Sequence, residues 1–506
     1  MEHTEKHIVA IDLGTSKIGL IVVKVNGDDV QVVYYKETAS AGILYSGVSN
    51  MVQACTPLRN LIKDAEEALN IQINQAVIGM PKYPIRQEAN SGKIMDRGDY
   101  TEITQEDVDN LKRFAQETYP LQSAEREAIY GAVAQSFSDG ENFQIKEEDI
   151  VGMSSNTLEG HFKIFIGKRR EVMNADALLA RAGISARKKY FTADTTARVI
   201  LSETEMENGV ALVDFGGGST SVTIYHDGIM RHYASIPFGG KNITHDIKSE
   251  LQITERLAEN IKLAFGACMP EKLLNMSEKV LHIMDKATGQ DKQVTVKYLS
   301  EIVTARVEEI MEAVLYEIDQ SGLAEHLRCG IVVTGGASQT ANLGMLINDM
   351  SGYKVRIGYP RADVAEIEID GTHEPSATIL LGLAMAAMKE ETGSCAVDVG
   401  EEFGHVEVEQ NHDNEETLEE TLEETQEEAP AKGDNEIVIV DENDDEDEEG
   451  DEEEERKLEK EDEKETEPTE RWKFLKVVWG KAQDIGASIN KMIDGITVDD
   501  EDEDEE

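Results

Sequence analysis

The chain has 506 residues and carries 102 Asp and Glu against 49 Lys and Arg, a formal net charge of −53 at pH 7. This length is sufficient for two or more hydrophobic cores, and the acidic excess disfavours binding to nucleic acid. The sequence contains no run of about 18 apolar residues, so no membrane-spanning helix is predicted. The four widely spaced cysteines are typical of reduced thiols in a cytosolic protein.

The first predicted element is a β-hairpin with a glycine-rich tip. Residues 9–23 read VAIDLGTSKIGLIVV, in which one apolar run ends at Asp12 and a second follows the turn. Glycines allow backbone N–H groups to converge on an anion, hydroxyl groups add donors, and a carboxylate at the strand end suits a hydrated Mg²⁺. The candidate phosphate-binding residues in this turn are Gly14, Thr15, Ser16 and Lys17. A plain tight turn remains the alternative for a single hairpin.

The next part of the chain alternates helices and strands. Apolar residues at spacings of three and four predict a helix over 51–70, and a strand is predicted over 75–80. Residues 83–165 have a different texture and are predicted to form an inserted α+β region. It contains extended segments at 128–137 and 160–167, and a helix with Thr104 as N-cap and Asp107 near position N3. A helix over 170–182, a strand over 188–192 and a helix over 194–205 follow.

A second hairpin repeats the design of the first. Residues 211–225 read ALVDFGGGSTSVTIY, with Asp214 before the turn. Its candidate phosphate-binding residues are Gly216, Gly217, Gly218, Ser219 and Thr220. Two such hairpins about 200 residues apart indicate a duplicated domain with a nucleotide clamped between the halves.

Helices dominate the following region, and a third glycine-rich element comes after it. Helices are predicted over 255–265 and 297–320. A strand over 330–333 then runs into Thr-Gly-Gly-Ala-Ser at 334–338, where the backbone would approach a base or an α-phosphate closely. The last predicted elements of the globular part are a helix from Asn342 and an apolar helix over 379–388.

The C-terminal region has a different composition. Residues 401–470 contain 35 acidic and 5 basic residues, so 396–469 is predicted to be a disordered linker. The apolar run 437–440 interrupts it, either as a short partner-binding strand or by chance.

Residues 471–496 place apolar side chains at spacings of three and four, with lysines on the other face, which is typical of a helix lying in a membrane interface. The candidate membrane residues are Trp472, Leu475, Val478, Trp479, Ile485, Ile489 and Ile493. The alternative is a helix docked on the protein's own core.

The order of these motifs resembles the actin/Hsp70/sugar-kinase superfamily and, within it, the FtsA family of bacterial cell division, of which the stretch IPFGGKNITHDI at 236–247 is especially typical. The resemblance implies an α/β, two-lobed, actin-like (ribonuclease H-like) ATPase fold with an α+β insertion, a disordered acidic linker and a C-terminal amphipathic helix. The implied boundaries are subdomain 1A at 1–82 and 166–204, subdomain 1C at 83–165, subdomain 2A at 205–245 and 328–395, subdomain 2B at 246–327, the linker at 396–469, the membrane-targeting helix at 470–497 and an acidic tail at 498–506.

The resemblance also assigns roles to individual residues. Asp12 and Asp214 would organise Mg²⁺ through water, and the two hairpin turns would hold the phosphates of ATP. The residues implied at the ribose and adenine are Glu259, Lys262, Gly335, Gly336 and Ser338. Without the family, Glu259 and Lys262 are interpreted as a surface ion pair.

The chain departs from many relatives at the residue expected to orient the attacking water. Thr192 stands where a Gln or Glu is usual, and Asp194 two residues later would either substitute or cap the helix. We therefore expect tight ATP binding with weak or negligible hydrolysis.

The implied partners are the C-terminal peptide of FtsZ, further copies of the chain in a head-to-tail polymer, anionic lipids and downstream division proteins, with no nucleic acid. Arg306 in the helical subdomain would pair with the acidic peptide; a solvated surface arginine is the alternative. The implied location is the cytoplasmic face of the inner membrane at the division site. Two other functions remain open: a pilus-assembly actin-like scaffold, and a kinase that phosphorylates a small molecule.

Overall fold

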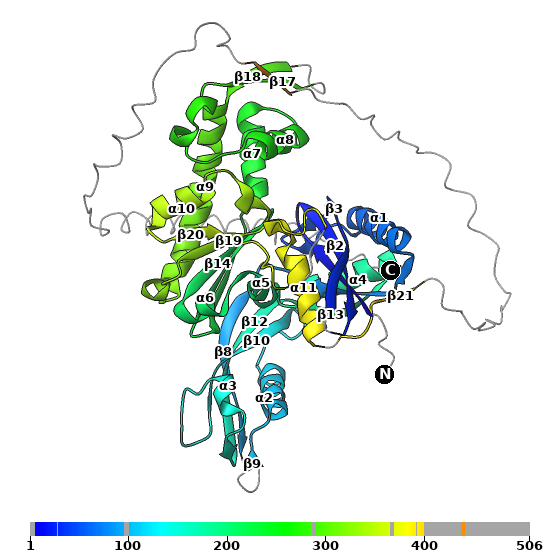
Figure 1. Ribbon diagram of the computed structural model, residues 1–506, viewed down its shortest axis with the longest axis vertical. Helices are drawn as coiled ribbons and strands as arrows, with labels where there is room; N and C mark the ends of the chain where they lie inside the picture. The colour runs from blue at the N-terminus through cyan, green and yellow to red at the C-terminus, as the bar shows by residue number, and fades with distance from the viewer. Residues whose placement is uncertain are drawn as a thin grey trace, which may run out of the picture. The chain divides into compact units, whose positions relative to one another are not determined.

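The computed structural model describes residues 6–27, 29–95, 101–285, 290–364, 369–390, 392–398 and 437–440 (Figure 1). These residues belong to one compact unit, Met1–Glu442. The predicted amphipathic helix and acidic tail lie outside the described residues, as does most of the predicted linker. Among the described residues, no helix has the length and apolar character needed to cross a bilayer.

The first lobe is built on a five-stranded sheet with helices on both faces. Its strand order is β13-β7-β1-β2-β3, with β1 antiparallel to β2 and parallel to β7. The bounds are β1 Lys6–Leu13, β2 Lys17–Asn26, β3 Asp29–Ala39, β7 Gln75–Gly79 and β13 Ser185–Tyr190.

Both faces of this sheet are buried, which explains the continuous apolar run in β1. Val9 and Ile11 pack on the side of α1 (Met51–Leu69) and α4 (Arg169–Ala182), whereas Ile8 and Ala10 pack on the side of α11 (Thr378–Lys389). Successive side chains of a strand point to opposite faces, so a strand covered on both sides has no polar alternation.

The second lobe repeats the topology of the first. Its strand order is β16-β15-β14-β19-β20. In both lobes a three-stranded antiparallel meander is followed by two parallel strands. The predicted duplication is therefore confirmed at the level of sheet topology. The bounds are β14 Val210–Phe215, β15 Thr220–His226, β16 Ile229–Ile236, β19 Ile331–Thr334 and β20 Val355–Ile357.

The inserted region forms its own small sheet, in the order β10-β12-β8. Thr104 caps α2 in a capping box with Asp107, as predicted. The bounds are β8 Arg86–Met95, β9 Thr101–Glu102, α2 Gln105–Glu117, β10 Glu127–Ser138, α3 Glu147–Ile150, β11 Ser154–Ser155 and β12 Thr157–Lys168. The expected α+β character is therefore present.

The predicted single helix over 194–205 is wrong, because two helices, α5 (Thr192–Ile200) and α6 (Glu203–Asn208), occupy this stretch. Leu201 is extended, and Ser202 starts the second helix with a capping box to Glu205. The Ser-x-x-Glu signature was present in the sequence. The strand predicted over 188–192 also starts earlier and ends at Tyr190, since Thr192 already begins α5.

The helical subdomain contains a β-hairpin that the sequence analysis did not anticipate. The hairpin is formed by β17 (Val280–Asp285) and β18 (Gln290–Thr295). The helices are α7 Gly240–Leu251, α8 Glu255–Phe265 and α9 Val296–Gln320. A third strand, β22 (Ile437–Val440), pairs with β17.

The remaining elements are short strands, 3₁₀ turns and the helix α10. They are β4 Ile43–Leu44, β5 Gly47–Val48, β6 Ile71–Ile73, α10 Leu343–Ser351 and β21 Ala396–Asp398, with 3₁₀ turns at Pro270–Lys272, Leu274–Met276, Ala324–His326, Gly336–Gln339 and Pro375–Ala377. Strand β21 pairs with β6. The prediction of a disordered linker from residue 396 is thus wrong for 396–398 and for 437–440.

Candidate functional site

The two glycine-rich hairpins have the predicted form. In each, the aspartate lies one residue before the end of the first strand: Asp12 is paired with Gly19, and Asp214 with Ser221. The turns between the paired strands are residues 14–16 and 216–219. Regular strand pairing therefore fixes the backbone of each aspartate close to the turn that follows it.

The tips of the two hairpins contact each other. A Cβ atom on Gly217 would lie 2.1 Å from Oγ of Ser16, and one on Gly218 would lie 2.5 Å from Oγ1 of Thr15. No real side chain tolerates such distances, so glycine is required at both positions for this approach. The glycines that the sequence singled out for phosphate binding therefore also allow the two lobes to meet.

A buried lysine lies between the two lobes at this point. Nζ of Lys82, which follows β7, donates to Oδ2 of Asp214 at 2.6 Å. Burial lowers the pKa of Lys82, but the carboxylates of Asp214 and Asp12 outweigh it, and the pKa is raised. Burial raises the pKa of Asp12 to about 6, against the opposing effect of Lys82. Lys82 thus pairs with Asp214, and its charge also acts on Asp12.

The charge balance at this point favours a divalent cation with a bound polyanion. Two carboxylates face one ammonium group, and Oδ1 of Asp214 is buried without a hydrogen-bond partner among the described residues. Carboxylate oxygens suit Mg²⁺, which usually retains waters and takes phosphate oxygens as further ligands. Among the described residues no group of three or more His, Cys, Asp or Glu is arranged to hold a metal ion. Asp12 and Asp214 therefore fit a Mg²⁺ shared with water and phosphate.

Lys82 is not among the site residues predicted from the sequence. Its partner is 132 positions away in the chain, so no local pattern could pair the two residues. The available signal was a lysine directly after a buried strand, in Met-Pro-Lys at 80–82. Lysines are rarely buried unless paired, but burial could not be read from that position.

The residues expected at the ribose and adenine lie together. Nζ of Lys262 lies 2.9 Å from Oε1 and 2.8 Å from Oε2 of Glu259, and it also contacts Oγ1 of Thr244 at 2.9 Å and the carbonyl of Gly240 at 3.2 Å. Burial lowers the pKa of Lys262, while Glu259 opposes this. The two residues therefore form the i,i+3 ion pair of the alternative interpretation, but it is partly buried and is also tied to α7.

The third glycine element lies against the second hairpin. Gly335 has φ +86°, and a Cβ there would be 2.6 Å from Oδ1 of Asp214. The hydroxyl of Ser338 is buried and donates to the carbonyl of Gly335 at 2.7 Å. A Cβ on Gly336 would meet nothing within 4 Å. Gly336 thus leaves open space, whereas Ser338 holds the turn in shape.

Lys17 is oriented differently from the other residues of its turn. Nζ of Lys17 lies 2.6 Å from Oε2 of Glu37, and about half of the Lys17 side chain is exposed. Its charge contributes a little to the lowered pKa of Lys262. The structure therefore places Lys17 in an ion pair with β3.

The two candidate catalytic residues, Thr192 and Asp194, line different cavities. Thr192 lines a cavity of about 10 Å³ with Asp214 and Thr196, whose buried Oγ1 has no partner among the described residues. A space of this size is about the smallest that can hold one water molecule. Oδ2 of Asp194 instead accepts from Arg198 at 2.9 Å and Oδ1 from Tyr225 at 3.0 Å. Asp194 is thus held by two donors, while Thr192 adjoins the candidate metal ligand.

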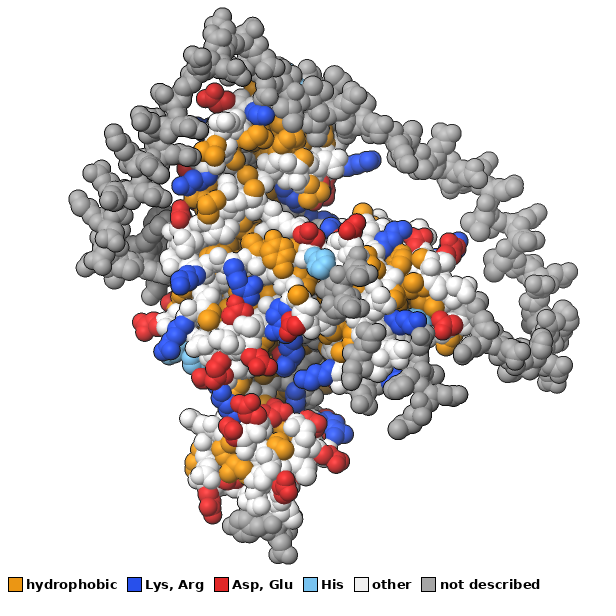
Figure 2. Space-filling view, in the orientation of Figure 1, with side chains coloured by type: hydrophobic (Ala, Val, Ile, Leu, Met, Phe, Trp, Pro, Cys, Tyr) orange, Lys and Arg blue, Asp and Glu red, His pale blue; other side chains and the backbone are white. Residues whose placement is uncertain are grey.

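Asp194 lines a second cavity, which is much larger. It measures about 1220 Å³ and is bounded by β10, β13, α5, α6 and the start of β16. Its charged residues are largely paired, for example Lys188 with Glu390 and Lys146 with Glu207. Basic and acidic side chains also lie beside each other on the face drawn in Figure 2. This cavity is separate from the cluster of Asp12, Lys82 and Asp214.

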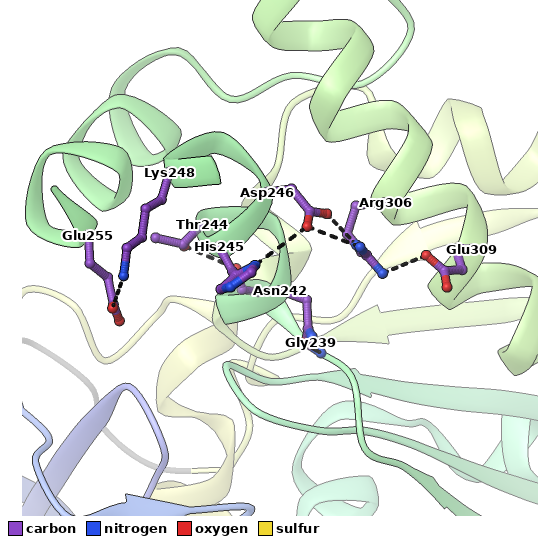
Figure 3. Close-up of polar contacts among 10 residues, drawn as sticks. Gly239, Asn242, Thr244, His245, Asp246, Lys248, Glu255, Arg306 and Glu309 are labelled. Atoms are coloured by element: carbon purple, nitrogen blue, oxygen red, sulfur yellow. Dashed lines mark hydrogen bonds and ion pairs between the residues drawn. The ribbon is translucent and has the colours of Figure 1, made fainter. Parts of the chain in front are cut away.

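Arg306 connects two helices of the helical subdomain, as Figure 3 shows. Its guanidinium on α9 contacts both carboxylate oxygens of Asp246 on α7, and Nη1 lies 2.5 Å from Oε2 of Glu309. Its pKa is raised, chiefly by the hydrogen bond to Asp246. Arg306 therefore has acidic partners within the subdomain. The seven candidate membrane residues lie outside the described residues.

The chain is similar in sequence to known cell-division proteins of one family. Residues 211–382 match the family model described as cell division protein FtsA. The cell division protein FtsA of Neisseria meningitidis serogroup B is 30% identical over 397 residues, covering 77% of this chain and 92% of that protein. The FtsA of Borreliella burgdorferi is 29% identical over 382 residues, covering 75% and 90%.

Comparison with solved structures bears on the fold. A chain of a structure described as a PilM-PilN type IV pilus biogenesis complex has a TM-score of 0.53 at 13% identity, covering 75% of this chain and 98% of that one. At this identity the likeness concerns the fold alone, and the predicted two-lobed actin-like fold is confirmed.

Proposed function

This chain belongs to the FtsA family of actin-like cell-division proteins, and on that premise we propose that it binds ATP with Mg²⁺ between its two lobes. The observation that carries the proposal is the meeting of two glycine-rich tips over Asp12, Lys82 and Asp214. The tips supply backbone and hydroxyl donors for phosphates, and the aspartates suit the cation. Lys82 and Lys17 add positive charge for the polyphosphate.

The bound nucleotide acts mainly as a signal. An efficient ATPase needs a group that orients the attacking water. Thr192 offers a hydroxyl or methyl group near Asp214, and Asp194 is engaged by Arg198 and Tyr225. We therefore expect turnover slower than about one per minute, with occupancy of the site setting the angle between the lobes and thereby head-to-tail polymerisation.

The chain then links the division machinery to the membrane. Family membership supports binding of the FtsZ C-terminal peptide and self-association, and the amphipathic pattern of residues 471–496 supports attachment to anionic lipid. Arg306 lies at the α7–α9 contact, where an acidic peptide would compete with Asp246 for the guanidinium. The protein would thus tether FtsZ filaments to the inner face of the cytoplasmic membrane at the division site.

The test is recruitment of a labelled FtsZ tail peptide to anionic vesicles. We expect the full chain with MgATP to bring the peptide into the vesicle pellet, and a chain ending at residue 468 to leave it in solution. A Trp479→Glu variant of the full chain is the matched control for the tail. Recruitment that is independent of residues 469–506, or equal with and without MgATP, would contradict the proposal.

A further inference from the structure

The hairpin β17–β18 has a partner strand from a distant part of the chain. Strand β22 pairs antiparallel with β17, and the register runs from Val280 opposite Val440 to Ile283 opposite Ile437. The sheet order is β18-β17-β22, so β17 is the central strand (Figure 1). Residues 437–440 therefore cover the edge of β17 that β18 leaves free.

This edge is well prepared to receive a strand. A two-stranded hairpin presents a row of unpaired N–H and C=O groups on each outer side and is marginal by itself. Leu281 and Ile283 of β17 are fully buried in the core of the helical subdomain. That packing holds the β17 backbone in place, so its free edge is a rigid template for a third strand.

The segment that covers this edge is unusual in its surroundings. Ile437, Val438, Ile439 and Val440 are the only run of four apolar residues between 399 and 470, and all are β-branched. β-branched residues favour strands. Asp434 and Glu436 precede the run, and Asp441 and Glu442 follow it. These charges disfavour extension of the strand, so its length and register are set locally.

We propose that the outer edge of β17 is a strand-binding site, and that its occupant is the segment 437–440 of the same chain. This inference is independent of nucleotide binding. Docking leaves 30 residues, 441–470, between β22 and the amphipathic segment 471–496, in place of the 72 residues, 399–470, that separate β21 from that segment in the sequence.

The first experiment tests the register by cross-linking. The full chain with His282→Cys and Val438→Cys is prepared with Cys329→Ser, because the other three cysteines are buried. The paired residues are directly opposite, and Cα atoms so placed lie about 4.5–5.5 Å apart, within disulfide range. We expect an intrachain disulfide under dilute mild oxidation, and none for the control pair His282→Cys with Thr421→Cys. Equal linking of the control, or linking only between chains, would overturn the proposal.

The second experiment measures hydrogen exchange of the β17 amides. Val438→Pro with Ile439→Pro removes two adjacent N–H groups, and one of them faces β17 because alternate residues of a strand bond to the same neighbour. We expect exchange in 280–283 to accelerate about tenfold or more, and a free peptide with the sequence of residues 434–442 to restore protection. Glu419→Pro with Glu420→Pro is the control and should leave it unchanged. Equal protection in both variants would overturn the proposal.

Discussion

Lys82 and Asp214 form a buried ion pair between the two lobes, and the charge of Asp12 acts on Lys82 from nearby. Removing one partner of a buried ion pair leaves an uncompensated charge and is strongly destabilising, whereas exposed pairs contribute little. Lys82 and Asp214 are 7% and 8% exposed. These residues therefore affect folding and ligand binding together, and experiments on them need controls that separate the two effects.

Lys82→Met is expected to weaken MgATP binding by about 10- to 100-fold, and ADP binding by less, because a charge-assisted contact to phosphate is lost. Fluorescence titration with labelled nucleotides measures both affinities. The double variant Lys82→Met with Asp214→Asn should recover stability without recovering affinity. Lys36→Met, which removes an exposed pair with Asp64, is the control. An unchanged ratio of ATP to ADP affinity in Lys82→Met would show that Lys82 has only a structural role.

The free energy of unfolding depends on pH through the carboxyl group of Asp12. Its pKa is raised from 3.8 to about 6, so between these values the folded chain binds more protons than the unfolded chain, and the protonated form favours folding. That contribution is complete below the unfolded pKa and is lost as the pH rises through 6. Without added nucleotide or Mg²⁺, the free energy of unfolding of Asp12→Asn minus that of the natural chain should rise by about 1 kcal/mol from pH 5 to pH 7, because only the natural chain loses this stability.

Urea unfolding of both chains at matched pH measures this difference. The comparison with Asp12→Asn removes the contributions of the other acidic groups, which the two chains share. A difference that stays constant, or shrinks, from pH 5 to pH 7 would contradict the assigned direction of the Asp12 pKa.

At the scale of elements, the central helices α5 and α11 bring the two lobes together. A Cβ on Gly382 of α11 would lie 2.6 Å from the carbonyl oxygen of Thr195 on α5, so the helix backbones approach closely. The hairpin tips approach in the same way through Gly217 and Gly218. The geometry of the site thus depends on glycines in two different kinds of element, and each supports the same contact between lobes.

Gly217→Ala should disturb the hairpin tips without disturbing the sheet. The new methyl group would meet Ser16, and separating the tips should lower MgATP affinity by about tenfold or more, a cost of at least 1.4 kcal/mol. Gly344→Ala in α10 is the control, since its Cβ would be 3.8 Å from Val355. Calorimetric titration with nucleotide distinguishes them. Equal affinity of the two variants would show that contact of the tips is unimportant for binding.

At the scale of the whole molecule, charge is concentrated toward the C-terminal end of the sequence. The last eight residues, 499–506, are all acidic, and the basic amphipathic segment 471–493 precedes them. An anionic bilayer attracts the lysines of this segment and repels the tail, with energies that fall off within a Debye length. The acidic sequence would therefore temper membrane binding through simple electrostatics.

Removal of residues 499–506 should tighten binding to anionic vesicles by about fivefold or more, corresponding to roughly 1 kcal/mol. Co-sedimentation at low salt measures this change, which should shrink as the salt concentration rises. A chain of unchanged length with Asn and Gln at these eight positions separates charge from length. No gain for either variant, or an equal gain on uncharged vesicles, would contradict an electrostatic role of the tail.

Local sequence determined much of this protein. Asp12 and Asp214 before glycine-rich turns, the capping box of Thr104 and Asp107, and the periodic apolar residues of α1 and α9 each specify their element through neighbouring residues alone. Repetition of the hairpin then indicated two lobes. Short elements such as β17 and β18 cannot be predicted from apolar periodicity, because so few residues define too weak a period. The break between α5 and α6 is marked in the sequence by Ser202 and Glu205, whose capping box starts a new helix.

Only the tertiary structure decided which distant residues meet. It paired Lys82 with Asp214, tied Lys262 to α7, directed Asp194 to Tyr225, and set Arg306 against Asp246. It also placed residues 437–440 on the edge of β17. The physical reason is that burial and charge pairing depend on how elements far apart in the sequence pack against each other. The sequence therefore specified two glycine-rich hairpins, and packing brought their tips together beside one buried lysine.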